Sequence, residues 1–350
     1  MKVEKNELSK KIDKIKGVVP KNSTIPALMG ILVQEGYLIA SNQELMIKAK
    51  IEGMEGEKFI VPSRAFDLIK NLPDGEVNIS EGKNNKITIS MDKIKNTYQS
   101  FPASDFIYTA KHIEDGGGNA AIDSKVLKES ISHVLYAIPN KGTNSVMNAL
   151  CLEAADGKLN FVGLDGHVIA WAQAEFEGTF KLLIPRSAVE KLLSLEMNGD
   201  VLIEYDKNSA VFKTDEYEVH TRLIEGEYFK YETFFNHLPL EIEVNRAELL
   251  EAVVRAKLCT EELCPTRFEI SGEELRLSIN DKSTDYSETV QLQKGIEKGL
   301  VIGFNSRLVL ETLKSHSGEK ITMLFEGGKR PMIVESEAMK SIVLPVQLRE

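Results

Sequence analysis

Apolar residues recur at helical spacing in three segments of the chain, and these segments begin about 120 residues apart. In each segment an apolar residue returns every three or four positions, which places these side chains on one face of an amphipathic helix. The three predicted faces consist of Leu8, Ile12, Ile15 and Val19, then Leu127, Ile131, Val134 and Ile138, and finally Leu249, Val253 and Ala256. The near-constant interval predicts three repeats of one structural unit.

A second helix and several strands recur within each predicted repeat. The second helices correspond to the segments VPSRAFDLIKNLP, IPRSAVEKLLSLE and GFNSRLVLETLKS. Alternating apolar and polar residues, as in GYLIASNQELMIKAKI and GDVLIEYDKNSAVFKT, predict antiparallel strands after both helices. Each repeat therefore has the order strand, helix, strands, helix, strands. This order is typical of an α+β fold with two helices packed on antiparallel sheets.

The length of 350 residues, 42% of them apolar, is sufficient for two or three domains. Turn-forming residues in KHIEDGGGNAA and FFNHLPLE predict domain boundaries, so we expect domains at 1–117, 118–239 and 240–350. The longest apolar runs, KLLIP and GLVIGF, fall far short of a membrane span of about 20 residues. The charged N-terminus also lacks the apolar stretch of a secretion signal. We therefore expect a soluble, cytoplasmic protein without membrane contact.

The net charge of −10 argues against an ordinary nucleic-acid binder, whose affinity comes mainly from phosphate neutralisation. The first predicted helix is an exception, because residues 1–22 hold seven lysines and three acidic residues. Cations also lie on the outer faces and adjoining loops of other helices. Those that could face DNA are Lys10, Lys14, Lys21, Arg64, Lys70, Lys125, Lys141 and Arg186. The alternative is that these side chains are merely solvated, which is the usual case on an outer helix face.

The sequence offers little chemistry for catalysis. It contains no glycine-rich phosphate loop between strand and helix, no G-x-S-x-G and no H-E-x-x-H motif. Cys151, Cys259 and Cys264 show no zinc or disulfide spacing, so we expect reduced thiols, no metal and no cofactor. One candidate pair remains, Asp165 and His167 in FVGLDGHVIAWAQAE. It fits either an aspartate that orients an imidazole or a hairpin turn, and the local sequence leaves both open.

Eight motifs in order along the chain resemble those of one family. They are STIPAL, VPSRAFDLIKNLP, FPASDF, LDGHVIA, LIPRSAVEKLL, RLIEGEYFKY, GFNSRLVLETLK and SIVLPVQL. Each motif is weak alone, but their order and spacing over nearly the whole chain are specific. The sequence resembles the bacterial DNA polymerase III beta subunit, the sliding clamp.

The resemblance implies three clamp domains per chain, a ring of two identical chains around duplex DNA, and no enzymatic activity. The implied partners are the DNA polymerase III alpha subunit, other polymerases and an ATP-dependent clamp loader. The family's pocket for short apolar peptides would comprise Met147, Leu164, Gly166, His167, Val168, Ile169, Phe229, Phe234, Leu263, Leu308, Val343, Leu344, Pro345 and Val346. In this setting Asp165 is expected to form a turn and not to orient His167.

Several residues depart from the family pattern, among them Arg330 and Asn236, which stand where smaller or apolar groups are usual. Val168 replaces a common arginine and Phe229 a common proline, which changes the expected peptide preference. Asn96 and Lys257 stand where apolar residues are expected at the dimer contact, which affects the expected stability of the dimer.

Three alternatives to a replicative clamp stay open. The first is a divergent clamp paralogue that serves a mobile element or a repair pathway. The second, from another class, is a hydrolase that uses Asp165 and His167, although no nucleophile or oxyanion site is visible. The third is a three-domain scaffold with no DNA role.

Overall fold

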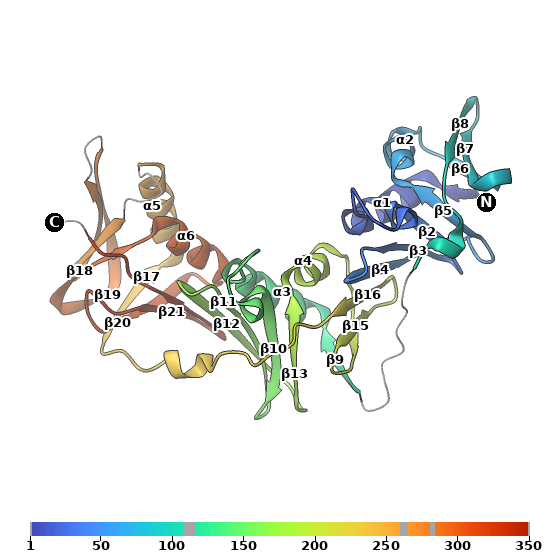
Figure 1. The fold of residues 1–350 in the computed structure, drawn as a ribbon. Helices are drawn as coiled ribbons and strands as arrows, with labels where there is room; N and C mark the ends of the chain where they lie inside the picture. Colours follow the sequence, from blue (N-terminus) through green and yellow to red (C-terminus); the bar gives the residue numbers. More distant parts are fainter. Residues whose placement is uncertain (1, 108–116, 260–264, 281–283, 349–350) are drawn as a thin grey trace. The chain divides into compact units, whose positions relative to one another are not determined.

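The computed structural model describes residues 2–107, 117–259, 265–280 and 284–348 (Figure 1). The first repeat contains β1 (Lys2–Glu4), α1 (Lys5–Ile15), β2 (Gly30–Gln34), β3 (Tyr37–Ser41), β4 (Leu45–Lys50), β5 (Lys58–Pro62), α2 (Phe66–Asn71), β6 (Glu76–Gly82), β7 (Lys86–Met91) and β8 (Ile94–Gln99). The second contains β9 (Gly118–Asp123), α3 (Ser124–Val134), β10 (Ala149–Ala155), β11 (Lys158–Leu164), β12 (Val168–Glu175), β13 (Phe180–Pro185), α4 (Arg186–Ser194), β14 (Asp200–Tyr205), β15 (Ser209–Lys213) and β16 (Tyr217–Arg222). The third contains β17 (Leu240–Asn245), α5 (Arg246–Leu258), β18 (Thr266–Asn280), β19 (Asp285–Phe304), α6 (Ser306–Ser315), β20 (Lys320–Phe325), β21 (Met332–Ser336) and β22 (Met339–Val343).

This order confirms the predicted threefold α+β repeat. Each repeat begins with a strand and a helix, continues with strands to a second helix, and ends with three strands. In the third repeat, the long strands β18 and β19 take the place of the four shorter strands between the helices. Asparagine begins both helices of this repeat. The Asn245 and Asn305 side chains accept the backbone N–H of Glu248 at 3.1 Å and of Arg307 at 2.9 Å, which satisfies donors that have no partner inside the helix.

The predicted helix faces are buried, with one error in the first helix. All predicted positions on α3 and α5 and in the turn after α3 are in the core. In the first repeat the prediction of Val19 was wrong, because Val18 is buried and Val19 is half-buried. The α-helix ends at Ile15, and the 3-10 turn Lys16–Val18 follows it. A 3-10 turn has three residues per turn, so the buried face moves by one position.

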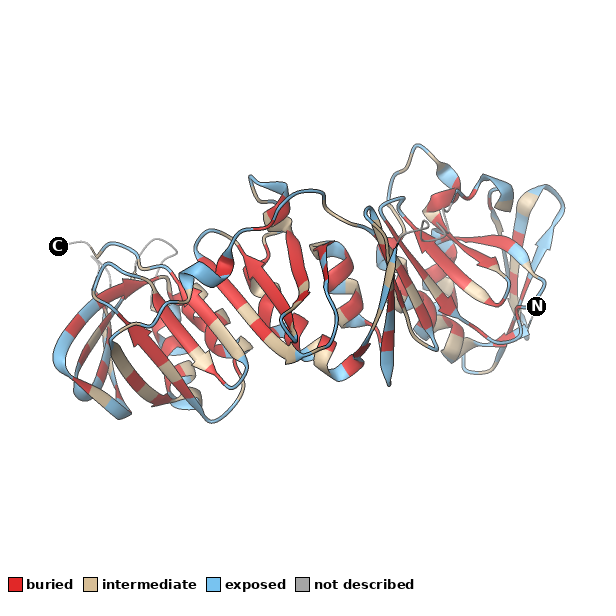
Figure 2. Ribbon diagram, turned by 90° about the horizontal axis from the view of Figure 1, so that it is seen from below, coloured by how far each residue is buried: buried red, intermediate tan, exposed pale blue. Residues whose placement is uncertain are grey.

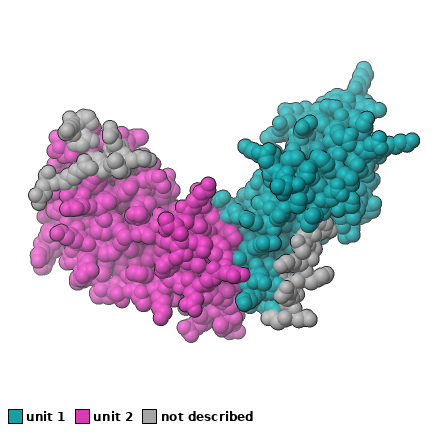
Figure 3. All heavy atoms as spheres, viewed as in Figure 1, with its two compact units in different colours: residues 1–127, 187–223 teal, residues 128–186, 224–350 magenta. Residues whose placement is uncertain are grey.

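The chain forms two compact units, coloured separately in Figure 3. Unit 1 consists of residues 1–127 and 187–223, and its larger sheet has the strand order β5-β2-β3-β4-β16-β15-β14-β9. Strands of the first and second repeats therefore share one sheet, which is continuous through the antiparallel pair β4–β16. A second sheet of this unit, β1-β6-β7-β8, contains strands of the first repeat alone.

Unit 2 consists of residues 128–186 and 224–350. Its sheet has the order β13-β10-β11-β12-β22-β21-β20-β17-β19-β18, so the second and third repeats join through the antiparallel pair β12–β22. The central repeat thus contributes strands to both units. Buried residues follow the strands and one face of the helices in each unit (Figure 2).

Candidate functional site

The segment Asp165–Gly166–His167, here called the DGH turn, connects β11 and β12 in unit 2. The Asp165 carboxylate accepts the backbone N–H groups of His167 at 2.8 Å and Val168 at 2.9 Å. Gly166 has φ +87°, a left-handed conformation that glycine adopts without strain. The expectation that Asp165 forms a turn is therefore confirmed, since its carboxylate holds the backbone and His167 is exposed.

The C-terminal segment lies against this turn. β22 pairs with β12 so that Val343 is opposite Val168, and the Leu344 N–H then donates to the His167 carbonyl at 2.9 Å. The strand ends at Val343, two residues before Pro345, which cannot donate to a ladder. The Val346 N–H nevertheless donates to the Gly303 carbonyl at 2.8 Å. Backbone hydrogen bonds therefore hold the tail in place.

Aromatic residues of the segment 224–238 pack into the hydrophobic core that also contains residues flanking the DGH turn. Tyr228 and Tyr231 belong to one buried cluster with Leu164, Ile169 and Ile342, and Met147 packs against that cluster. The Tyr231 hydroxyl donates to the Glu153 carboxylate at 3.1 Å, and burial raises the pKa of Tyr231 above its usual range. This packing leaves the neighbouring side chains Phe229 and Phe234 on the surface.

The predicted pocket residues separate into a buried and an exposed group. Those in the core or half-buried are Met147, Leu164, Val168, Ile169, Leu308, Val343 and Pro345. The large apolar side chains that reach solvent are Phe229 at 36%, Leu344 at 38%, Val346 at 40% and Phe234 at 54% exposure, and we call these four residues the apolar patch. Val168 and Val343 are buried opposite each other in the β12–β22 pair, directly before the tail. Leu308 lies on α6, which contacts β22, and Leu263 lies outside the described residues.

The described residues around the apolar patch offer neither an activated thiol nor a metal-binding cluster. Cys151 is buried in the same cluster, and burial raises the pKa of its thiol to about 12, so the thiol stays protonated at neutral pH. Cys151 and Cys259 are free thiols. Over the described ranges, no cluster of His, Cys, Asp or Glu could hold a metal ion. The exposed aromatic and aliphatic side chains of the patch are suited to apolar contact.

The predicted DNA-facing lysines of α1 have acidic neighbours within unit 1. Lys10 forms an ion pair with Glu196 at 2.7 Å, and Lys14 lies 3.5 Å from the same carboxylate. Lys14 also donates to the Ser194 carbonyl at 2.9 Å, where α4 ends. Its charge therefore stabilises the negative end of the α4 dipole. Lys10 holds the pKa of Glu196 below its usual range.

The other predicted cations differ in their surroundings. Lys70 lies 3.6 Å from Asp13, whereas the side chains of Lys21, Arg64, Lys125 and Lys141 are exposed. Arg186 begins α4, and its guanidinium donates to the Leu135 carbonyl at 2.9 Å and to the Ile138 carbonyl. These bonds tie Arg186 to the end of the preceding helical segment, so its side chain has a structural role within unit 2.

Sequence reasoning missed Lys11, which is buried on α1. Its ammonium pairs with Glu216 and lies 4.7 Å from the centre of the Tyr217 ring. The signal was present, because Lys11 stands three residues after Leu8 and four before Ile15 on the apolar stripe. The ion pair and the ring contact compensate for burial of the charge.

Models of the N-terminal, central and C-terminal domains of the DNA polymerase III beta subunit match residues 1–109, 121–230 and 238–347. The chain belongs to this family. The beta sliding clamp of Pseudomonas aeruginosa is 24% identical over 368 residues, and that of Chlamydia pneumoniae 25% over 377, each covering 99% of both chains. A putative DNA polymerase III beta subunit of Eubacterium rectale has a TM-score of 0.90 at 26% identity, covering 99% of this chain and 98% of its own. The Bacillus subtilis sliding clamp gives 0.91 at 21%, covering 99% of each.

The family is a non-catalytic processivity factor, which agrees with the geometry of the DGH turn. The hydrolase alternative was therefore wrong, because the Asp165 carboxylate serves the backbone and the family performs no reaction. Among the described residues, no helix is long and apolar enough to cross a bilayer.

Proposed function

We propose that two copies of this chain form a ring that encircles duplex DNA without sequence specificity and tethers the replicative polymerase to it. The observation that carries the proposal is the match of three consecutive clamp-domain models to a chain built from one α+β unit three times over. The proposed domains have the bounds 1–117, 118–239 and 240–350. The protein confers processivity by topology, since a closed ring cannot leave a closed DNA circle.

Sheet edges support a two-chain ring. Within the chain, β4 pairs with β16 and β12 with β22, so a strand of one repeat pairs with the last strand of the next. In the described residues, β8 is the last strand of the first repeat, and its only sheet neighbour is β7. The hairpin β18–β19 ends the other sheet. Pairing of β8 with this hairpin of a second copy would continue the rule and remove two open edges. The exposed Asn96 and Lys257 would weaken apolar packing near this contact.

The charge distribution suits a ring that slides. A net charge of −10 disfavours tight DNA binding, and a ring held by topology needs only weak contacts. Lys10 and Lys14 share the carboxylate of Glu196, which reduces their attraction for phosphates further. The exposed cations Lys21 and Arg64 would complete a weak, sequence-independent lining.

We also propose that the apolar patch binds short peptides with apolar anchors from the DNA polymerase III alpha subunit and other polymerases. Exposed aromatic and aliphatic side chains over a rigid core are typical of such a surface. The backbone bonds of Leu344 and Val346 fix two of the side chains in advance, so less conformational entropy is lost on binding. Phe229 gives this chain a bulky ring where the family commonly has proline, which would alter the preferred peptide.

An ATP-dependent loader would open the ring, and a cytoplasmic location follows from a role on chromosomal DNA. A divergent paralogue that serves repair or a mobile element has the same ring and differs in its partners. Pull-down of the host polymerases on the immobilised chain distinguishes the two, because a replicative clamp retains the alpha subunit.

Retention on DNA tests the proposed ring. The chain is loaded onto a nicked circular plasmid with a bacterial clamp loader and ATP, and the plasmid is then cut once. We expect stable retention on the circle, release within minutes after cutting, and renewed retention when both ends are blocked with bound streptavidin. Equal retention on circular and open linear DNA would contradict encirclement. The scaffold alternative predicts no retention on any of the three.

A further inference from the structure

A second turn of the same construction lies in unit 1, between β3 and β4. The Asn42 side chain accepts the backbone N–H groups of Glu44 at 3.1 Å and Leu45 at 2.8 Å. The Asn42 N–H donates to the Leu45 carbonyl at 3.1 Å. In the DGH turn, the Asp165 N–H donates to the Val168 carbonyl at 3.2 Å in the same way. The middle residue Gln43 has φ +77°, close to the +87° of Gly166. Backbone and side-chain bonds therefore repeat those of the DGH turn.

The strand that follows this turn also has an equivalent neighbour. β4 pairs with β16 so that Thr221 is opposite Leu45, and β12 pairs with β22 so that Val343 is opposite Val168. In both cases the first residue after the turn faces a residue near the end of the last strand of the next repeat. The threefold repeat therefore builds the same framework, a turn followed by a strand pair between neighbouring repeats, at both junctions, β4–β16 and β12–β22.

The next backbone bond completes the correspondence. The Arg222 N–H donates to the Glu44 carbonyl at 3.1 Å, as the Leu344 N–H donates to the His167 carbonyl at 2.9 Å. Arg222 thus takes the place of Leu344 in the apolar patch, and Glu44 takes the place of His167. The framework is shared, but its chemistry changes from apolar to charged.

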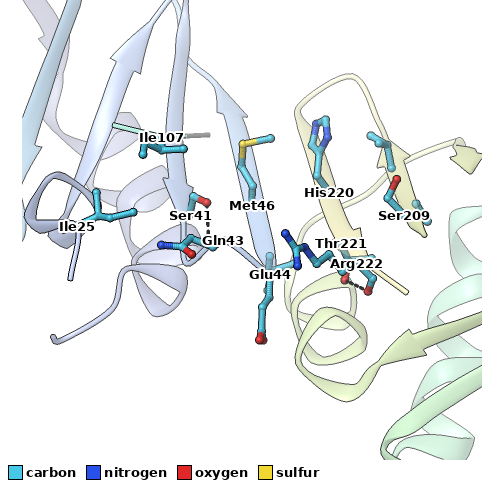
Figure 4. A pocket seen from close by; sticks show the side chains of 13 residues that line it. Ile25, Ser41, Gln43, Glu44, Met46, Ile107, Ser209, His220, Thr221 and Arg222 are labelled. Carbon is cyan, nitrogen blue, oxygen red and sulfur yellow. Dashed lines mark hydrogen bonds between the residues drawn. The ribbon is translucent and has the colours of Figure 1, made fainter. Parts of the chain in front are cut away.

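A cavity of about 300 Å³ lies beside this β3–β4 turn and is lined in part by residues of β4, β15 and β16 (Figure 4). Ile25, Met46, Ile107 and Val211 supply apolar walls, and Ser41 and Ser209 supply hydroxyl groups. This volume is at the lower limit for ligand pockets, so it suits one or two amino-acid residues and not a large cofactor. Apolar walls with a few polar groups are typical of sites that fix an anchor side chain.

The charged groups around the cavity favour an anion. In the described part of the chain, the guanidinium of Arg222 has no ion-pair or hydrogen-bond partner, and the Glu44 carboxylate points away from it (Figure 4). His220 lies 3.1 Å from Glu218, and Lys48 lies 3.0 Å from the same carboxylate. These bonds, from His220 first, lower the pKa of Glu218 to about 2, so its charge is already neutralised locally. Arg222 is left as the cation at the mouth.

We propose that this cavity is a second peptide site, which takes an extended segment with an apolar side chain followed by an acidic one. The apolar side chain enters between Met46 and Val211, and the carboxylate pairs with the guanidinium of Arg222. Arginine and carboxylate form charge-assisted hydrogen bonds that are about twice as strong as neutral ones. The site goes beyond the ring and the apolar patch, because it stands on the geometry of unit 1 and would let the chain hold a second, chemically distinct partner segment.

Methyl NMR of the full chain, labelled with ¹³C at the methionine methyl groups, tests this site. The probes are the acetylated dipeptide amides Ac-Leu-Asp, Ac-Leu-Lys and Ac-Gly-Asp, in which the aspartate side chain is the only carboxylate, and Met46→Leu assigns the Met46 signal. We expect saturable movement of this signal with Ac-Leu-Asp, and binding at least tenfold weaker for the other two probes. Arg222→Ala should weaken Ac-Leu-Asp binding about tenfold, whereas Lys207→Ala, at an exposed position on the β14–β15 turn, should leave it unchanged.

Four results would overturn the proposal. A Met46 signal that does not move with Ac-Leu-Asp excludes the cavity as a peptide site. Equal binding of Ac-Leu-Lys, or full binding by Arg222→Ala, excludes recognition of the carboxylate. Equal binding of Ac-Gly-Asp excludes the apolar anchor. None of these measurements uses DNA or a polymerase, so their failure leaves the proposed ring function intact.

Discussion

Acid is expected to destabilise unit 2 through a buried pair of histidines. His316 on the segment after α6 contacts Ser336 at 2.7 Å and Ser341 at 3.0 Å, and its ring lies edge-on to that of His133 at 4.7 Å. Burial, then the charges of His133 and Arg246, lower the pKa of His316 to about 3. The network links α3 of the second repeat to β21 and β22 of the third, and β22 carries the tail of the apolar patch.

The size of the effect follows from the two pKa values of His316. Its ordinary pKa is 6.5, so below this pH the unfolded chain binds a proton that the folded chain refuses until about pH 3. Stability is therefore complete above pH 6.5 and falls by about 1.4 kcal/mol per pH unit within this window. Between pH 7 and pH 5 the loss from this one group is about 2 kcal/mol. The pKa of His133 is also lowered by burial, which adds to the loss.

Urea unfolding followed by tryptophan fluorescence measures this loss. The chain has one tryptophan, Trp171 on β12, whose indole N–H donates to Asn160 at 3.0 Å, so its emission reports on unit 2. With a typical urea dependence, 2 kcal/mol lowers the midpoint by about 1 M. His316→Gln keeps hydrogen-bonding groups near both serines but cannot titrate. Its stability should change less between pH 7 and pH 5, whatever its absolute stability.

The matched control is His167→Gln, since His167 is exposed and lies outside the histidine network. This variant should show the same pH dependence as the parent chain. If His316→Gln and the parent chain lost equal stability between pH 7 and pH 5, the depressed pKa of His316 would be refuted. The acid response would then belong to the carboxylates.

Two further results are expected. Leu344→Ala with Val346→Ala keeps the backbone bonds of the tail but removes two anchors of about 1.5–3 kcal/mol each. Affinity for a polymerase-derived peptide, measured by fluorescence anisotropy, should fall more than a hundredfold. The exposed Val301→Ala should change nothing, and unchanged binding by the double variant would place the peptide site elsewhere. Lys10→Ala with Lys14→Ala should lower the salt slope of DNA binding by about 0.9 for each phosphate that is no longer neutralised, equally on unrelated sequences. A sequence-dependent effect would contradict a sliding surface.

Much of the fold could be predicted because its signals are local. Helix faces repeat every three or four residues, so the burial of Leu127 and Leu249 could be inferred from their neighbours in sequence. The turn at Asp165 was likewise one of two stated alternatives, and the resemblance to the clamp family favoured it correctly. Val18 escaped prediction because the helix tightens into a 3-10 turn after Ile15, and a single period does not describe both segments.

The sequence by itself determined the helices and strands, because each depends on residues close together along the chain. It also determined the three repeats and the family, because the order and spacing of motifs can be read without the fold. Only the tertiary structure decided which strands of neighbouring repeats pair with each other, as β4 does with β16 and β12 with β22. It also placed Glu196 beside Lys10, bound Arg186 to carbonyl groups of another segment, and put Arg222 where the other junction has Leu344. The bonds of Arg186 and Lys10 join residues 48 and 186 positions apart. No local pattern encodes such a distance, since these bonds exist only once the sheets have formed.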